Sequence, residues 1–528
     1  MKNVFVFLFS FSILTLFFLA TNTAYSQAFR TTWKTTDSEI TIPTNDSLEY
    51  DYKIIWKNLT NRGVGNGSAK NQKGNYTIKN LENGSTYEIA IIGKFPHFFM
   101  DYNKIEKVKL QTLEEWGTIQ WQSMNHAFMG CINLTYKATD SPDLRKVKNL
   151  SYMFYNCNKL DGNSTMNKWN TSTITDMSGM FKYADSFNQP IGDWDMQNVT
   201  NTNQMFNGAA LFNQPIGDWN TENVTDMGSM FYAATSFNQP IGKWNIQNVI
   251  NMSALFYATT SFNQPIEKWN TKNVIQMDGM FYKATSFNQP LEKWNTSKVT
   301  DMSYMFYKAT SFNQSIGNWN TQNVENMRSM FDNATSFNQP IGEWNTQNVT
   351  TMKAMFYIAS SFNQSLGNWN TEKVKDMSEM FYYATSFNQP IEKWNTKNVT
   401  DMRSMFYVAN AFNQSIEEWN TEKVRHMSEI FYYAAVFNQP IGKWNISNIK
   451  YNDQSYEENG LINIFEYCGM NKENYDATLI GWANNKNAPK NITLTANGLK
   501  YCKSKEARQK LIKEYGWTIE GDELDCED

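Results

Sequence analysis

The sequence predicts a repeat solenoid, a row of stacked 25-residue coils with a β-rich module before it and an α+β cap after it. Aromatic residues make up 15% of the 528 residues, far more than a disordered chain contains. One 25-residue unit is too small to bury its own apolar face, so identical units must stack on one another. The period comes from tryptophan, which recurs twelve times without one insertion, at Trp169, Trp194, Trp219, Trp244, Trp269, Trp294, Trp319, Trp344, Trp369, Trp394, Trp419 and Trp444.

Residues 1–26 have the form of a secretory signal peptide. Lys2 supplies the positive charge, residues 4–19 are an apolar run, and Ala24-Tyr25-Ser26 is a cleavage pattern before Gln27. A membrane anchor is the alternative, but the run is short for a span, which needs about 20 apolar residues. We therefore expect cleavage and export, with no transmembrane span in the mature chain.

Residues 27–112 are expected to form a small β-sandwich-like module. Alternating apolar and polar residues predict five strands, and turn-rich segments separate them. The simplest role of this module is to cap the N-terminal end of the solenoid. The predicted strands are 39–43, 50–56, 76–81, 86–95 and 107–110.

The repeats occupy residues 113–450, and their positions are counted here from the valine as 0. The consensus is V-x-x-M-x-x-M-F-x-x-A-x-x-F-N-Q-P-I-x-x-W-N-x-x-x. Positions 0, +3, +7 and +10 share one face of an α-helix, and Asp, Asn or Thr before the first Met is a suitable N-cap. The segment around proline suits a short extended strand and a bend, because proline lacks an N–H.

Two asparagine columns run through the repeats. One holds position +14 from Asn188 to Asn438, and the other follows the tryptophan from Asn170 to Asn445, with Asp195 the only exception. Stacked asparagine side chains hydrogen-bond along an array. We interpret both columns as structural. A ligand site is the alternative, but a residue repeated in every coil suits a scaffold better than a single pocket.

Residues 451–528 are expected to form the C-terminal cap. The sequence predicts helices over 471–485 and 504–515 and a short strand over 491–495. A polar end unit of this kind prevents end-to-end aggregation of a solenoid.

The string N-V-T-D-M-S-x-M-F-x-x-A-x-x-F-N-Q-P-I-x-x-W-N, present with small changes at 223–245 and 398–420, resembles the repeat of BspA-like leucine-rich-repeat proteins of bacterial surfaces. The resemblance covers residues 112–480, with an entry-like segment at 114–144 and cap-like segments at 475–483 and 498–502. It implies a right-handed solenoid with a parallel sheet on one side and short helices on the other. It also implies adhesion or recognition, without catalytic residues.

The five cysteines cannot all be paired. Cys502 and Cys526 lie together in the C-terminal tail and are the favoured disulfide. Cys131 and Cys157 occupy position +10 of adjacent coils, where either a disulfide or two buried thiols is expected. Cys468 has no partner in this column and is expected to be a buried thiol.

Composition and motifs argue against nucleic-acid binding and catalysis. The net charge is -4, without the basic stripe that a phosphate backbone requires. His97, His126 and His426 have no metal-ligand spacing, and no nucleophile, zinc or phosphate-loop motif occurs. We expect no enzyme activity, cofactor or metal. The acidic residues lie at variable positions and are interpreted as solvated surface, for example Glu267, Glu292, Glu392, Glu417 and Glu418.

Tyrosines at position +8 are the candidate ligand-binding residues. On a helix this position points about 120° away from the centre of the apolar face, so they should form an outward stripe. They either stack on one another to stiffen the array or form a flat platform for a glycan or protein. The column begins with Tyr155, and the candidates are Tyr232, Tyr257, Tyr282, Tyr307, Tyr357, Tyr382, Tyr407 and Tyr432.

These features together predict a secreted or cell-surface protein that presents an extended solenoid surface to a protein or polysaccharide. Many weak contacts repeated along the array would supply the affinity. The alternative is a structural spacer that holds the N-terminal module away from the cell surface, which the near identity of the coils favours. A glycan-active enzyme is a third hypothesis, for which the sequence offers no carboxylate pair at a defined separation.

Overall fold

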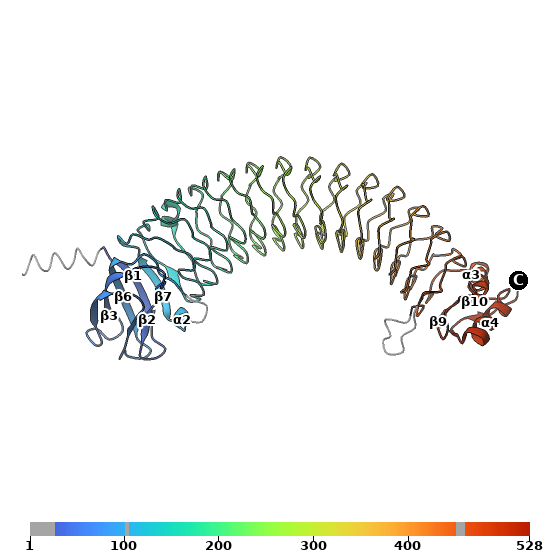
Figure 1. Cartoon of the computed structure of the whole chain (residues 1–528), viewed down its shortest axis with the longest axis horizontal. Coiled ribbons are helices and arrows are strands. Elements are labelled where there is room, and N and C mark those ends of the chain that lie inside the picture. The colour runs from blue at the N-terminus through green and yellow to red at the C-terminus, as the bar shows by residue number, and fades with distance from the viewer. Residues whose placement is uncertain (1–26, 101–104, 450–459, 528) are drawn as a thin grey trace, which may run out of the picture. The chain divides into compact units, whose positions relative to one another are not determined.

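A computed structural model describes residues 27–100, 105–449 and 460–527 (Figure 1). It divides into two compact units, Met1–Asn248 and Val249–Asp528. The signal peptide expected over residues 1–26 lies outside the described residues. Within the described ranges, no helix is both long enough and apolar enough to cross a membrane.

The first unit begins with a six-stranded sheet in the order β4-β3-β6-β1-β7-β8. Neighbouring strands from β4 to β7 are antiparallel, and β2 pairs with β5 in a separate two-stranded sheet. The bounds are β1 Phe29–Lys34, β2 Ile40–Ile42, β3 Asp51–Asn58, β4 Gly67–Gln72, β5 Tyr76–Ile78, β6 Thr86–Lys94, α2 Glu106–Lys109, β7 Leu110–Glu115 and β8 Thr135–Tyr136.

Four of the five strands predicted for this module correspond to β2, β3, β5 and β6. The prediction missed β1 and β4, and the strand predicted over 107–110 is wrong, since the turn of helix α2 precedes β7 there. The boundary placed at residue 112 falls inside β7. The sequence of β4, GSAKNQ, contains no β-branched or aromatic residue, so its strand conformation depends on pairing with β3.

The sheet of the module continues into the first repeats. Strand β7 pairs in parallel with β8, with Leu113 opposite Tyr136. The indole N–H of Trp116 donates a 2.8 Å hydrogen bond to the Tyr136 hydroxyl. The Asp140 carboxylate accepts hydrogen bonds from the backbone N–H groups of Trp116 and Gly117, at 3.0 and 2.8 Å. The module therefore covers the first coil with a paired strand, as a cap must.

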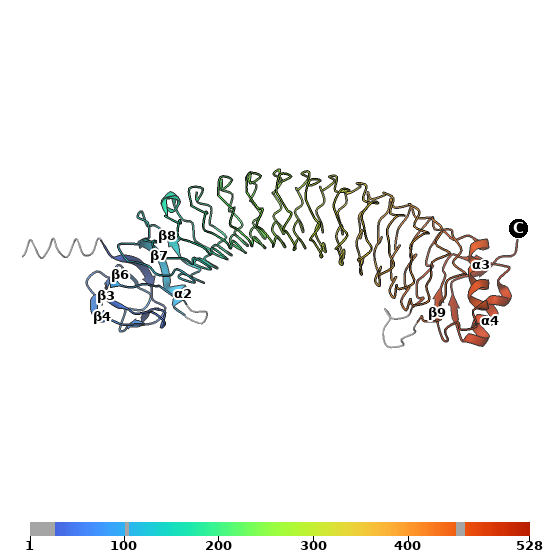
Figure 2. The ribbon, with the colours of Figure 1, turned by 45° about the horizontal axis from the view of Figure 1, so that its top comes forward.

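Within each unit, the repeats stack as successive coils of the ribbon (Figure 2). Successive coils are joined by parallel β-bridges at position +2. After each bridge, every second backbone N–H group donates a hydrogen bond to a carbonyl of the following repeat. Gln204, Phe206 and Gly208 donate to the carbonyls of Gly228, Met230 and Tyr232 at 2.9, 2.9 and 2.6 Å. Bridged positions are Asn149, Asp176, Asn201 and Asp226 in the first unit, and Asn251, Gln276, Asp301, Asn326, Thr351, Asp376, Asp401 and His426 in the second.

The short helix predicted for each repeat is wrong. In the described repeat residues the one helical element is η1, Ser164–Lys168, a 3-10 helix. The other repeats form consecutive turns, as where the N–H of Met230 bonds to the carbonyl of Met227. Residues at +5 and +9 adopt left-handed backbone, for example Ser229 and Ala233, both with φ of 54°. A left-handed residue interrupts an α-helix, and the freed N–H groups bond to the neighbouring repeat instead.

The apolar face is nevertheless buried as predicted. Met227, Phe231 and Ala234 at +3, +7 and +10 are all 1% exposed or less. Turns closed by bonds between residues three apart return the chain to the same side every three or four residues, as a helix does. The tryptophan column at +20 is also buried, and from Trp294 to Trp444 each indole N–H bonds to a carbonyl of the preceding repeat. That of Trp344 donates to the Ile316 carbonyl at 3.1 Å.

The second unit ends in the cap. Residues 460–467 supply one further rung, since the N–H groups of Glu429 and Tyr433 donate to the carbonyls of Ile462 and Glu466 at 3.0 and 2.8 Å. The predicted helices and strand correspond to α3, α4 and β9. The bounds are α3 Lys472–Asn484, β9 Thr493–Thr495, β10 Lys500–Tyr501, α4 Lys505–Tyr515, β11 Thr518–Glu520 and β12 Glu523–Leu524.

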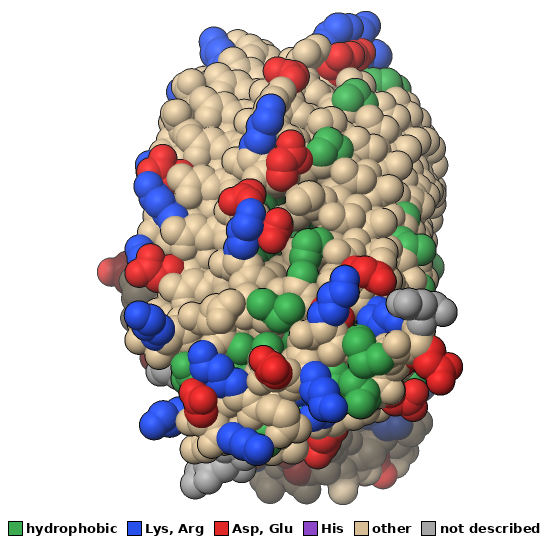
Figure 3. All heavy atoms as spheres, turned by 90° about the vertical axis from the view of Figure 1, so that its right-hand side faces the viewer, with side chains coloured by type: hydrophobic (Ala, Val, Ile, Leu, Met, Phe, Trp, Pro, Cys, Tyr) green, Lys and Arg blue, Asp and Glu red, His purple; other side chains and the backbone are tan. Residues whose placement is uncertain are grey.

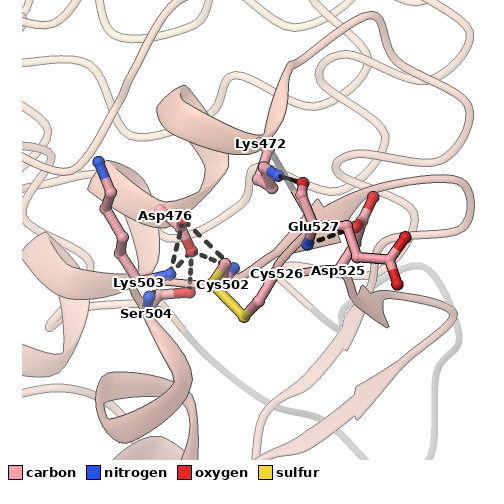
Figure 4. The surroundings of a disulfide bond; sticks show 8 residues. All are labelled: Lys472, Asp476, Cys502, Lys503, Ser504, Asp525, Cys526 and Glu527. Carbon is pink, nitrogen blue, oxygen red and sulfur yellow. Dashed lines mark hydrogen bonds between the residues drawn. A yellow bond between two sulfur atoms is a disulfide. The ribbon is translucent and has the colours of Figure 1, made fainter.

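Of the five cysteines, two form a disulfide and three are free thiols. Cys502 and Cys526 form a disulfide beside Asp476, whose carboxylate accepts backbone hydrogen bonds from Cys502, Lys503 and Ser504 (Figure 4). The alternative disulfide between Cys131 and Cys157 is not formed, and both are buried free thiols. The Cys157 thiol donates to the Phe128 carbonyl at 3.1 Å instead.

Candidate binding surface

The tyrosines at +8 form face-to-face stacks in the second unit. Tyr257, Tyr282 and Tyr307 stack at 4.0 and 4.3 Å between ring centroids. A second run, Tyr357, Tyr382, Tyr407 and Tyr432, stacks at 4.4, 4.4 and 4.6 Å. All eight candidates are half-buried, and Tyr232 lies in the first unit. Of the two alternatives, stacking of the tyrosines on one another is confirmed within each run, and the rings of the stripe are half-buried because their faces lie against neighbouring rings.

Ring spacing differs between the two sides of the second unit. Tyrosine centroids lie 4.0–4.6 Å apart, whereas the buried tryptophan centroids from Trp269 to Trp444 lie 6.2–6.4 Å apart. The spacing between successive repeats of the second unit is therefore smaller at the tyrosine column than at the tryptophan column. The tyrosine side is the compressed side, which accounts for the close contact of its rings.

Asp332 occupies the tyrosine position between the two runs. Its side chain replaces the ring expected between Tyr307 and Tyr357, and the residue is 8% exposed. Its Oδ1 accepts a 2.7 Å hydrogen bond from the Asn333 amide. Burial raises the pKa of Asp332 to about 6, which the hydrogen bonds from Asn333 and Ser329 partly offset.

Beside the second tyrosine run, polar side chains at +4 and +5 line a groove with a volume of about 550 Å³. The Lys353 ammonium lies 3.3 Å from the Glu379 carboxylate, and Arg403 pairs with Asp401 at 2.8 Å. The Ser404 hydroxyl donates to the Glu429 carboxylate at 3.1 Å. We call this the polar groove; its lining is Lys353, Glu379, Arg403, Ser404, Ser428, Glu429 and Ile462.

A second set of tyrosines, at position +9 and its equivalent in the last rung, is more exposed than the stacked column. Tyr383, Tyr433 and Tyr467 are 40%, 44% and 51% exposed. Their rings are tilted against their neighbours, as in the 52° angle between Tyr432 and Tyr433. The sequence interpretation missed these residues. The doubled tyrosines at 382–383 and 432–433 were the available signal.

The asparagine column at +14 forms the predicted ladder. The Oδ1 of Asn313 accepts hydrogen bonds from the Asn338 N–H and the Gln339 amide at 2.9 and 3.0 Å. The column after tryptophan behaves differently, since the Oδ1 of Asn345 accepts from the Gln347 N–H of its own repeat at 3.2 Å. Its side chains therefore close local turns, and the ladder predicted for this second column is wrong.

In the part of the chain that the structure describes, the histidines and acidic residues do not gather into a metal site. Across residues 27–100, 105–449 and 460–527, no group of three His, Cys, Asp or Glu side chains is arranged to hold a metal ion. His97 is buried, which lowers its pKa to about 4, and its Nε2 lies 2.8 Å from the Asn125 carbonyl. On the face seen in Figure 3, basic and acidic side chains are interspersed.

A family model described as "Mycoplasma protein of unknown function, DUF285" matches the chain in seven overlapping stretches. Together they span residues 97–464 and tile the repeats, which identifies the array as repeats of that family. The stretches are 97–209, 122–242, 189–294, 229–334, 280–389, 313–416 and 363–464. No curated protein matches the chain.

Proposed function

The chain belongs to the DUF285 repeat family, and we propose that it is a secreted or cell-surface protein that binds a protein or polysaccharide in adhesion or recognition. The signal-like residues 1–26 support export. The proposed architecture is a right-handed, leucine-rich-repeat-like solenoid of the BspA-like type. The tiling of the family model and the parallel bridges within each unit support that architecture.

The observation behind this proposal is the aromatic surface near the end of the second unit. The stacked run from Tyr357 to Tyr432 contacts two exposed rings, Tyr383 and Tyr433, at 5.1 and 4.8 Å. Exposed tyrosines of this kind contribute little to the core, which the Phe, Met and Trp columns fill. Tyrosine is enriched at binding surfaces because it offers a large, rigid apolar face with a polar tip.

We propose binding rather than catalysis at this surface. Glu379 is held in an ion pair with Lys353, and Glu429 accepts a hydrogen bond from Ser404. A glycosidase pair would instead place a protonated and an ionised carboxyl group on either side of one bond.

The second candidate function is a spacer that holds the N-terminal module away from the cell. The asparagine ladder supports it, because Asn288, Asn313, Asn338 and Asn363 each accept the same pair of bonds from the following repeat. In a spacer, ligand contacts would come from the module, whose Leu59 and Val64 are 47% and 53% exposed.

A binding screen of the chain from Gln27 onward against arrays of glycans and cell-surface proteins tests the proposal. Two double variants are compared with the wild type, Tyr383→Ala with Tyr433→Ala, and Leu59→Asp with Val64→Asp. Loss of binding in the tyrosine variant alone supports the repeat surface as the binding element. Loss of binding only in the Leu59→Asp and Val64→Asp variant supports the spacer. If the wild type binds no glycan or protein of the arrays, the proposed binding function is overturned.

A further inference from the structure

We infer that the polar groove is a binding site for an uncharged oligosaccharide, whose sugar rings extend from the groove to the exposed tyrosines that contact the stacked run. This inference rests on the proposed binding function and assigns it a ligand class and a place. The groove volume of about 550 Å³ falls within the range of small-ligand sites, which is about 300–1,000 Å³.

The lining of the groove combines donors and acceptors rather than one sign of charge. Lys353 and Arg403 are donors, Glu379 and Glu429 are acceptors, and Ser404 is both. Sugar hydroxyls also donate and accept, so they can bond to both kinds of group. A strongly anionic or cationic ligand would meet repulsion from half of this lining.

The carboxylate of Glu429 is the principal anchor that we assign. Among the residues that the structure describes, Ser404 donates a hydrogen bond to its Oε2, and no cation lies within ion-pair distance of it. A carboxylate that retains acceptor capacity in a groove is suited to receive a pair of hydroxyl donors. By contrast, Lys353 already pairs with Glu379, and Arg403 with Asp401.

The backbone at the floor of the groove leaves no place for an added peptide strand. The N–H groups of Glu379, Ser404 and Glu429 donate to the carbonyls of Arg403, Ser428 and Ile462 at 2.8, 2.9 and 3.0 Å. Strand addition requires unpaired backbone groups at a sheet edge. A ligand here is therefore held by side chains, which favours a ligand rich in hydroxyl groups over an extended peptide.

Two tyrosines of the stacked run lie one turn from groove residues, since the N–H groups of Tyr407 and Tyr432 donate to the carbonyls of Ser404 and Glu429 at 3.2 and 3.1 Å. Burial raises the pKa of Tyr407 to about 12, and the Glu429 carboxylate adds to this rise, as it does at Tyr432. Tyr433 follows Tyr432, with its ring tilted by 52° and its centroid 4.8 Å from that of Tyr432, and we assign its exposed face to the apolar face of a pyranose.

Calorimetric titration of the chain from Gln27 onward with neutral hexasaccharides tests the inference. The probes are cellohexaose, laminarihexaose, xylohexaose and mannohexaose, and the variants are Glu429→Ala and Tyr433→Ala. Tyr183→Ala is the matched control, because Tyr183 also occupies +9 and is 39% exposed, but lies in the first unit. At least one hexasaccharide should bind, and Glu429→Ala and Tyr433→Ala should each weaken its binding tenfold or more while Tyr183→Ala leaves it unchanged.

Circular dichroism and thermal melting establish that the variants remain folded. A Glu429→Gln variant keeps an acceptor oxygen, so it should retain part of the affinity for the hexasaccharide. Hexasaccharide binding that is unaffected by both groove variants would overturn this site while leaving the binding function in place. Binding only of a protein or a charged glycan in the array screen would overturn the ligand class alone. Failure of every probe in both experiments would overturn both proposals.

Discussion

The side-chain oxygen Oδ1 of Asn438 accepts a 2.9 Å hydrogen bond from the backbone N–H of Asn471, the first position of the cap to meet the asparagine ladder. The Asn474 amide donates to the same oxygen at 2.9 Å. Earlier in the array these two bonds come from the Asn and Gln of the next repeat. The start of helix α3 thus reproduces the polar contacts of a repeat, and the cap joins the array through its ladder.

Replacing Asn438 with Ala should therefore loosen the cap. The change removes the acceptor for two donors at once, so we expect a loss of about 1–3 kcal/mol in local stability. Hydrogen exchange of α3 and the residues around it measures this loss. Asn345→Ala is the control, because its Oδ1 serves one local bond, and a loss there equal to that of Asn438→Ala would contradict the prediction.

Asp332 should make the second unit less stable as the pH rises from about 4 to 6. Burial raises its pKa from 3.8 to about 6 in the folded chain, so the folded state binds more protons than the unfolded state across this window. Stability therefore falls as the proton is lost through the folded-state pKa, by up to about 3 kcal/mol, and this contribution becomes constant above about pH 7.

Denaturant unfolding of the wild type and Asp332→Asn between pH 4 and 7 tests this effect. The asparagine variant should lack the fall and be more stable at pH 7. Equal pH profiles for the two chains would show that Asp332 does not titrate differently on folding.

Val408 should be a site where glycine stabilises the protein. It has φ of 52°, which is strained for a β-branched residue. Glycine relieves about 1–2 kcal/mol of this strain, against a smaller cost from the freer unfolded chain. Thermal melting of Val408→Gly should show a higher midpoint. Ala409→Gly, at a buried neighbour without a positive φ, should lower the midpoint, and a fall in both variants would refute the assignment of left-handed backbone.

Thiol titration should find three reactive cysteines in the denatured, unreduced chain and five after reduction, because Cys502 and Cys526 are bridged. In the native chain, Cys131 and Cys157 should react very slowly, since both are buried and burial raises the pKa of the Cys157 thiol. One reactive cysteine in the denatured, unreduced chain would indicate a second disulfide.

The polar groove could not be predicted from the sequence. Its charged residues, such as Glu379, Arg403 and Glu429, come from different repeats and from variable positions. Each one alone resembles ordinary surface. Only stacking, which places every 25th residue in one row, brings them into a single site.

The period and the pattern of burial were determined by the sequence alone. Met227, Phe231 and Trp244 recur at fixed offsets, and any stack of such repeats must bury them together. The backbone path was decided by the tertiary structure. A helix and a chain of three-residue turns bury the same side chains, and they differ in whether an N–H bonds within its own repeat or to the next. That choice depends on a neighbouring repeat, which places Ser229 and Ala233 in left-handed backbone and covers the tyrosine faces with other rings.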